Sequence, residues 1–204
     1  MRRPMATMTV ETEVAGDVVA ELFELYLMAF AHLEWSAAAR HLLLEQEFRE
    51  EVEDPRTLKY ITWDDEGSPI ALITVTSDLE VLPWISQSFY ERRFPDQYAR
   101  GAIHYLGVGV VHPDARSSGA LREMLWHVGA AASEVGAIIA TDMCEHNRKA
   151  GLHRLFDSIC MEVLGAHLVE IDRQIYYGAV VPKGSLRSIG QPEESAESVP
   201  RTGL

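Results

Sequence analysis

A polar turn between a predicted strand and a predicted helix carries groups that can hold a phosphate. In residues 110–125, VVHPDARSSGALREML, β-forming residues give way to a proline and then to an amphipathic helix. A pyrophosphate needs backbone amides, the positive end of a helix dipole and no bulky side chain in the way. An ordinary turn with Ser118 as the N-cap is the alternative interpretation. The groups offered are a permanent cation, two hydroxyls and two small residues: Arg116, Ser117, Ser118, Gly119 and Ala120.

The segment before this turn carries side chains that can accept a proton. Residues 102–111, AIHYLGVGVV, are strongly β-forming. His104 titrates near neutral pH, whereas Tyr105 needs a perturbed pKa. Because side chains alternate along a strand, at most one of these two faces a given cleft. Glu80, in a preceding loop, is a third candidate, and a purely structural role for His104 is the alternative.

The hydrophobic patterns predict a mixed α/β chain in which antiparallel strands come first and a strand-helix-strand crossover follows. The order is βααββ, an aromatic-rich loop over 77–101, and then βαβαββ. We expect one domain over residues 1–182 and a disordered tail over 183–204, which lacks a core-forming run. The expected strands are 8–14, 58–63, 69–75, 102–111, 137–143, 166–171 and 174–181, and the main expected helices are 17–33, 36–53, 119–135 and 147–155.

The charge distribution excludes some partners and directs attention to the turn. The formal net charge of -13 disfavours nucleic acid, which is bound through many Lys and Arg side chains. Residues 100–155 hold 6 basic and 5 acidic side chains, the only near-neutral part of an acidic chain. That balance favours a polyanionic small molecule there. With no long apolar run and no signal-like N-terminus, we expect a cytoplasmic protein without membrane insertion.

The cysteines and acidic groups do not predict a metal site. Cys144 and Cys160 are the only two cysteines, and they lack a CxxC spacing. Asp142, Glu145 and His146 lie near Cys144, but their spacing does not place ligands on one face of a helix. We therefore expect inert thiols and no bound metal.

The segment VHPDARSSGAL (111–121) resembles the acyl-CoA-binding motif of the GNAT superfamily of acyltransferases, [Q/R]-x-x-G-x-[G/A]. Arg116 and Gly119 match that motif, and Leu121 stands at its last position. The family's element order covers residues 8–181. The resemblance implies an α/β (α+β) fold, with about six to seven strands in a mixed sheet and about four flanking helices. It also implies that the sheet is splayed at the strand pair that binds CoA.

The resemblance also implies which residues would bind the acyl donor, acetyl-CoA or another acyl-CoA. The amides near Gly109, Val110 and Val111 would polarise the thioester carbonyl. Asn147 matches a second landmark of the family, an asparagine after the next strand. The tyrosine that in the family protonates the departing thiolate has no counterpart among residues 153–156, HRLF.

The implied activity is transfer of an acyl group to an amine of a small-molecule or amino-acid-like acceptor. One alternative is an enzyme similar to N-acyl amino acid synthases, whose long-chain donor comes from acidic acyl carrier protein. That variant would need Arg92, Arg93 and Arg100 to form a basic patch on this acidic chain. The other alternative is a catalytically silent module that senses a ligand or binds a partner. A homodimer is left open.

Overall fold

The computed structural model describes residues 7–38 and 42–183. The chain divides into two units, residues 1–171 and 172–204, and each is described by itself. In the second unit, residues 172–183 form neither helix nor strand. The tail predicted over 183–204 lies outside the described residues from position 184 onward, and the single domain predicted over 1–182 stays a prediction.

The first unit is built on a five-stranded mixed sheet in the order β1-β2-β3-β4-β5. The first four strands are antiparallel to their neighbours, and β5 runs parallel to β4. The predicted hairpin between β2 and β3 is confirmed, with Oδ1 of Asp64 accepting the amides of Glu66 and Ser68 at 2.9 Å each. The strands are β1 (Thr7–Glu11), β2 (Thr57–Trp63), β3 (Pro69–Thr76), β4 (Ile103–Val111) and β5 (Ile138–Thr141).

The predicted count of six to seven strands is wrong, because neither 166–171 nor 174–181 is a strand in the described chain. In the first of these segments, a side chain takes the place of a neighbouring strand. Oδ1 of Asp157 accepts the amide of Leu168 at 2.8 Å and lies 3.2 Å from Nδ1 of His167. In the second, β-forming residues are present, but no strand of the described residues pairs with them.

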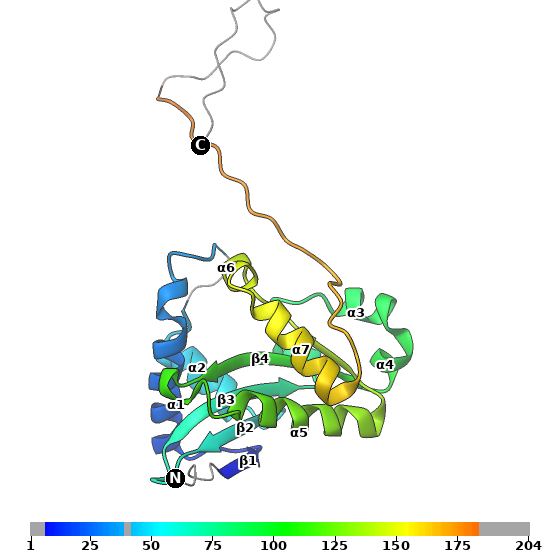
Figure 1. The fold of residues 1–204 in the computed structure, drawn as a ribbon. Helices are drawn as coiled ribbons and strands as arrows, with labels where there is room; N and C mark the ends of the chain where they lie inside the picture. The colour runs from blue at the N-terminus through cyan, green and yellow to red at the C-terminus, as the bar shows by residue number, and fades with distance from the viewer. Residues whose placement is uncertain (1–6, 39–41, 184–204) are drawn as a thin grey trace, which may run out of the picture. The chain divides into compact units, whose positions relative to one another are not determined.

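Two pairs of helices cover the two faces of the sheet (Figure 1). One face packs against α1 (Gly16–Phe30) and α2 (Glu45–Glu53), and the other against α5 (Ala120–Val135) and α7 (Leu152–Leu164). About four helices were predicted, whereas the described residues form seven α-helices. The remaining elements are short: η1 (Ala31–Leu33), η2 (Leu79–Val81), α3 (Gln87–Arg93), α4 (Pro95–Ala99), η3 (Pro113–Ala115) and α6 (Glu145–Lys149).

The start of α2 differs from the helix predicted from Ser36. Oε2 of Glu47 accepts the amide of Leu44 at 2.7 Å, which satisfies a backbone donor at the helix start. Glu45 and Glu47 also place negative charge in the first turn, where the helix dipole favours it. None of the described helices combines the length and the apolar character needed to cross a bilayer.

Candidate functional site

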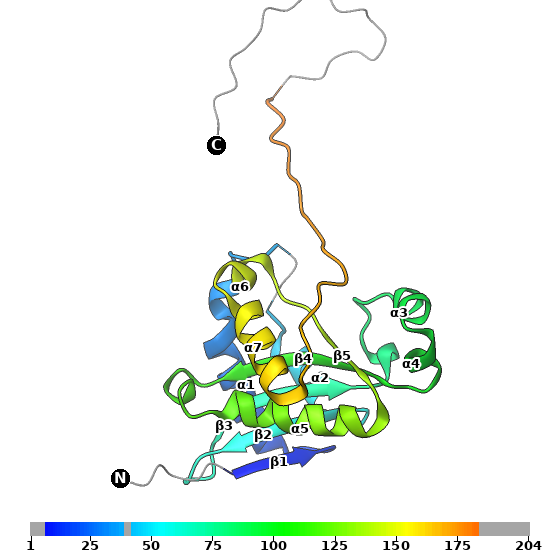
Figure 2. The same cartoon turned by 45° about the vertical axis from the view of Figure 1, so that its right-hand side comes forward.

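Strands β4 and β5 diverge halfway along β4. They are paired only from Ile103 opposite Ile138 to Leu106 opposite Thr141. Oγ1 of Thr141 donates to the carbonyl of Leu106 at 3.2 Å and closes the paired region. Beyond it, β4 continues to Val111, while the chain after β5 turns away toward α6 (Figure 2). Within residues 7–38 and 42–183, no strand therefore pairs with the second half of the β4 edge that faces β5.

A β-bulge in β4 sits where the two strands diverge. Ile73 is opposite Gly109 but Val75 is opposite Leu106, so β4 has an extra residue there. Oγ1 of Thr74 accepts the amide of Val108 at 2.7 Å and takes the place of a ladder bond. As a result, Gly107 and Val108 both face α1 and α2.

The backbone of the unpaired edge is available at alternate residues. The amide of Val108 points toward β3, and that of His112 donates to the carbonyl of Ile70 at 2.8 Å. Because amide directions alternate along a strand, those of Gly109 and Val111 point to the open edge and that of Val110 points to β3. A Cβ added at Gly109 would meet no atom within 4 Å. Among the described residues, the face of β4 toward α5 and α7 is therefore open above Gly109.

The backbone hydrogen bonds of the turn after β4 join residues within the turn. The amide of Arg116 donates to the carbonyl of Pro113 at 3.4 Å, and the amide of Ser118 to that of Ala115 at 2.9 Å. Oγ of Ser118 accepts the amide of Ala120 at 3.1 Å. The N-cap of α5 is Gly119, one position after the residue that the alternative interpretation predicted. Arg116, Ser117, Ser118 and Gly119 are exposed, and Gly119 adopts a φ of 93° that favours glycine.

Leu121 does not lie in this turn. Its side chain is half-buried and packs in the core between the sheet, α5 and α7. A surface hollow of about 490 Å³ runs from Gly119 along α5 to α7, where Arg122 pairs with Glu162. The position that departs from the motif thus faces the core and leaves the turn accessible.

His104 and Tyr105 lie on opposite faces of β4, as alternation predicted. His104 is half-buried, and burial lowers its pKa. Tyr105 is buried, and its phenol donates to Oδ1 of Asp142 at 2.7 Å. Burial first, and then the charge of Asp142, raise the pKa of Tyr105 well above its usual range. Tyr105 is therefore protonated at neutral pH and is a hydrogen-bond donor in this arrangement, not a base.

Two other predicted residues belong to elements other than β4. Glu80 is exposed in η2, where its amide donates to Oδ1 of Asp78 at 3.0 Å. Asn147 is half-buried in α6. The ring of His146 in the same helix lies 5.6 Å from the ring of His32, so α6 lies beside η1. Neither residue belongs to β4 or to the turn after it.

Glu51 lies at the β-bulge although no sequence motif singled it out. Oγ1 of Thr74 donates to Oε1 of Glu51 at 3.2 Å. The same oxygen would lie 3.1 Å from a Cβ added at Gly107. A signal was present in the sequence, because Glu51 is one position before the buried Val52 and three after the buried Phe48. That phase places it next to the buried stripe of α2, unlike Glu50.

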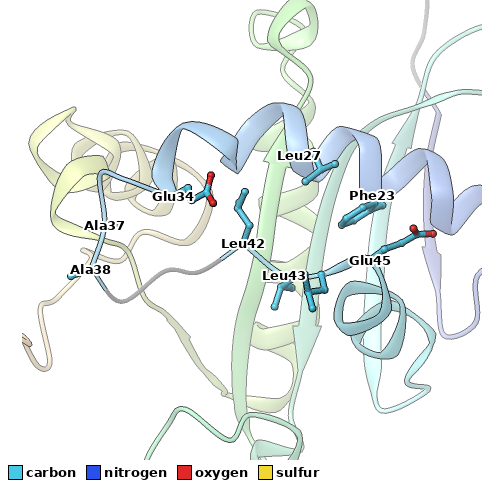
Figure 3. A pocket seen from close by; sticks show the side chains of 9 residues that line it. Phe23, Leu27, Glu34, Ala37, Ala38, Leu42, Leu43 and Glu45 are labelled. Atoms are coloured by element: carbon cyan, nitrogen blue, oxygen red, sulfur yellow. The ribbon is translucent and has the colours of Figure 1, made fainter.

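A second hollow, of about 590 Å³, lies between the end of α1 and the segment before α2 (Figure 3). Phe23 and Leu27 reach toward it from α1, and Leu42 points up toward α1 from the connecting segment. Glu34 and Glu45 add carboxylates to this mainly apolar lining. The sequence patterns did not predict this hollow.

No three His, Cys, Asp or Glu side chains converge as metal ligands in the part of the chain that the structure describes. Cys144 and Cys160 are free thiols. Burial, with a contribution from the charge of Asp157, raises the pKa of Cys160 and so disfavours its thiolate.

Solved structures of acetyltransferases are similar to this chain in fold. Aminoglycoside 6'-N-acetyltransferase AAC(6')-Ih from Acinetobacter baumannii is 16% identical, with 86% of this chain and 100% of that chain covered and a TM-score of 0.52. AAC(6')-Iy, in complex with CoA, is 12% identical, with 88% and 99% covered and a TM-score of 0.50. Both are N-acetyltransferases of the GNAT family. The chain has the GNAT fold.

A third structure with this fold is an aminoglycoside acetyltransferase from an uncultured soil metagenomic sample, in complex with trehalose. It is 10% identical, with 84% of this chain and 96% of that chain covered and a TM-score of 0.50. No family model matches the chain, and no curated protein matches it. At these identities the likeness establishes the GNAT fold and assigns no role to any residue.

Proposed function

We propose that this protein is an N-acyltransferase that moves an acetyl or other acyl group from acyl-CoA to an amine of a small-molecule acceptor. The observation that carries the proposal is the unpaired edge of β4 beyond Leu106, next to the exposed turn at Arg116. An extended chain such as the pantetheine arm can pair with a strand edge of this kind. The pyrophosphate would then reach the start of α5.

The backbone of β4 supplies the donors for the reacting carbonyl in this proposal. The amides of Gly109 and Val111 point to the open edge, where they would polarise a thioester carbonyl and stabilise the developing oxyanion. The predicted contribution of Val110 is left out, because its amide points to β3. The roles of Asn147 and Glu80 stay predictions.

The turn holds the phosphates mainly through side chains. Arg116 is exposed and always charged, and Ser117 adds a hydroxyl. Ser118 would have to release the amide of Ala120 before that amide could donate to a phosphate. Gly119 and Ala120 leave the approach to the helix start free of bulky side chains.

A cationic amine suits the charge of this chain better than an acidic protein does. Residues 1–99, which include α1 and α2, carry 8 basic and 19 acidic side chains. Such a field attracts ammonium groups and repels acyl carrier protein. Arg100 does not support a basic patch for that carrier, since its Nη1 donates to the carbonyl of Val135 at 2.8 Å. We therefore favour acyl-CoA as the donor.

Calorimetry with acetyl-CoA and with longer acyl-CoAs tests the donor, and release of free CoA with a panel of amines tests the reaction. We expect micromolar binding and amine-dependent release of CoA. Absence of binding at high micromolar acyl-CoA would overturn the proposal. Binding without turnover on any amine would favour a module that senses acyl-CoA.

A further inference from the structure

We propose that Glu51 is the general base of this reaction, an inference that rests on the proposed function. Its Oε1 accepts a hydrogen bond from Oγ1 of Thr74 at 3.2 Å, and it approaches β4 at Gly107. Gly107 is the first residue of β4 beyond its pairing with β5. The carboxylate thus lies over the point where the thioester edge opens.

A single hydroxyl links the carboxylate to the backbone of the bulge. Oγ1 of Thr74 accepts the amide of Val108 at 2.7 Å, and its one proton is directed to Glu51. This direction of donation suits an ionised carboxylate, which only accepts hydrogen bonds.

Glycine at position 107 is what allows the carboxylate to come this close. A Cβ there would lie 2.8 Å from Oγ1 of Thr74 and 3.1 Å from Oε1 of Glu51. At Gly109, on the opposite face of the strand, a Cβ would meet nothing within 4 Å. The two glycines thus serve different needs: one admits the carboxylate and the other leaves the strand edge open.

The bases predicted from the sequence are less well placed. Tyr105 is a protonated donor to Asp142, and Glu80 is an exposed side chain of η2. His104 is on the face of β4 that packs toward α5 and α7, opposite the face of Glu51. Glu51 is a proton acceptor that lies on one face of the sheet, at the point where β4 and β5 diverge.

The step balances without a further reactant. Glu51 first takes a proton from the ammonium group and passes it to solvent. The neutral amine nitrogen then attacks the thioester carbon, a C–N bond forms, and the C–S bond breaks with its electron pair going to sulfur. The proton that the nitrogen loses as the amide forms goes through water to the thiolate. The products are the amide and free CoA.

Three variants of the full chain test this role: Glu51→Gln, Glu51→Asp and, as a matched control on the exposed face of α2, Glu50→Gln. The probes are acetyl-CoA with spermidine, kanamycin and phenethylamine. We expect Glu51→Gln to lower kcat by about 100- to 10,000-fold while acetyl-CoA affinity stays the same. Glu51→Asp should retain part of the activity, and Glu50→Gln should match the unchanged protein.

A second readout separates a base from a structural residue. A weakly basic amine such as phenylhydrazine is already neutral at neutral pH, so Glu51→Gln should slow its acetylation much less. Equal losses for both amine classes, or a loss that follows a lowered Tm, would assign Glu51 a structural role. Retained turnover in Glu51→Gln with a loss in His104→Asn would overturn the role of Glu51 and leave the proposed function intact. An unchanged protein that fails to bind acetyl-CoA would overturn the proposed function with it.

Discussion

The phenol of Tyr105 and the carboxylate of Asp142 form a 2.7 Å hydrogen bond that ties β4 to the segment after β5. The bond lies next to the last paired residues of these strands, Leu106 and Thr141. It therefore holds the two strands together at the base of their divergence. Tyr90 packs edge-on against the Tyr105 ring and extends this contact to α3.

Replacing Tyr105 by Phe should destabilise the fold by about 1–2 kcal/mol, because a buried hydrogen bond to a carboxylate is lost. The pKa of Tyr105 is raised mainly by burial, so the folded chain holds the phenolic proton more tightly than the unfolded chain. Its stabilising effect is present below the ordinary tyrosine pKa of about 10 and is lost as the pH rises beyond it. Thermal unfolding of both proteins between neutral and alkaline pH measures the difference.

The advantage of the unchanged protein over Tyr105→Phe should shrink as the pH rises. Tyr60, whose pKa burial also raises, is present in both proteins and cancels in the comparison. A gap in Tm that stays constant into the alkaline range would contradict this prediction.

Alanine substitutions at the two glycines of β4 should affect different properties, stability at Gly107 and acetyl-CoA binding at Gly109. Gly107→Ala places a Cβ against Thr74 and Glu51 and should cost about 1–3 kcal/mol of stability. Gly109→Ala meets no neighbour and should leave stability within about 0.5 kcal/mol, as at other open sites. Under the proposed function it should weaken acetyl-CoA binding by about tenfold, a difference of about 1.4 kcal/mol.

Urea denaturation and calorimetry on both variants check this contrast. If Gly109→Ala binds acetyl-CoA as well as the unchanged protein, the donor does not run along this part of β4. If Gly107→Ala is fully stable, the bulge is less tightly packed than the distances indicate.

Lys59 should be essential for stability although it carries a charge in the core. Its side chain is 0% exposed, and Nζ donates to the carbonyls of Thr12 and Asp54 at 2.8 Å each. Burial lowers its pKa, and nearby carboxylates such as that of Asp54 oppose this effect. Lys59→Met leaves both carbonyls without their donor and should cost about 1–3 kcal/mol.

Urea denaturation of Lys59→Met, with Lys149→Met as an exposed control, measures this cost. The control should change stability by no more than about 0.5 kcal/mol. A stabilised Lys59→Met protein would mean that removing the buried charge outweighs the two lost hydrogen bonds.

Arg116→Ala should weaken acyl-CoA binding without affecting the fold. The side chain is exposed, and its hydrogen bonds to phosphate would be charge-assisted. Their loss should raise Kd by about 10- to 100-fold, which corresponds to about 1.5–3 kcal/mol. Calorimetry at two salt concentrations measures it, and Arg154→Ala, an exposed arginine on α7, is the control. Equal Kd values for the two variants would mean that Arg116 does not bind the phosphates.

Local patterns predicted the strands and helices that depend on neighbouring residues alone. The β-forming residues of 102–111 predicted β4, and the acidic turn with Gly67 predicted the hairpin before it. The segment over 174–181 is also rich in β-forming residues, but a strand requires a second strand to pair with. β-propensity alone therefore overestimated the sheet.

The features at the divergence could not be predicted in the same way. The bulge depends on a hydroxyl from Thr74, a residue on another strand. Its effect is to bring Glu51 of α2 to Gly107 of β4, two residues that are distant in sequence. By contrast, the exposed turn at Arg116 was predicted because its composition and its helix start are local features.

The extra residue at Gly107 and Val108 also sets how far the length of this strand can vary. The bulge lets Tyr105 and Val110 face the same side although five positions separate them. In a strand of this length that alternated regularly from Tyr105, Val108 and Val110 would instead turn away from α1 and α2. Deleting Gly107 would remove the extra residue and keep Val108 and Val110 on that side, so the bulge is the place where this strand can lose one residue without reversing its faces.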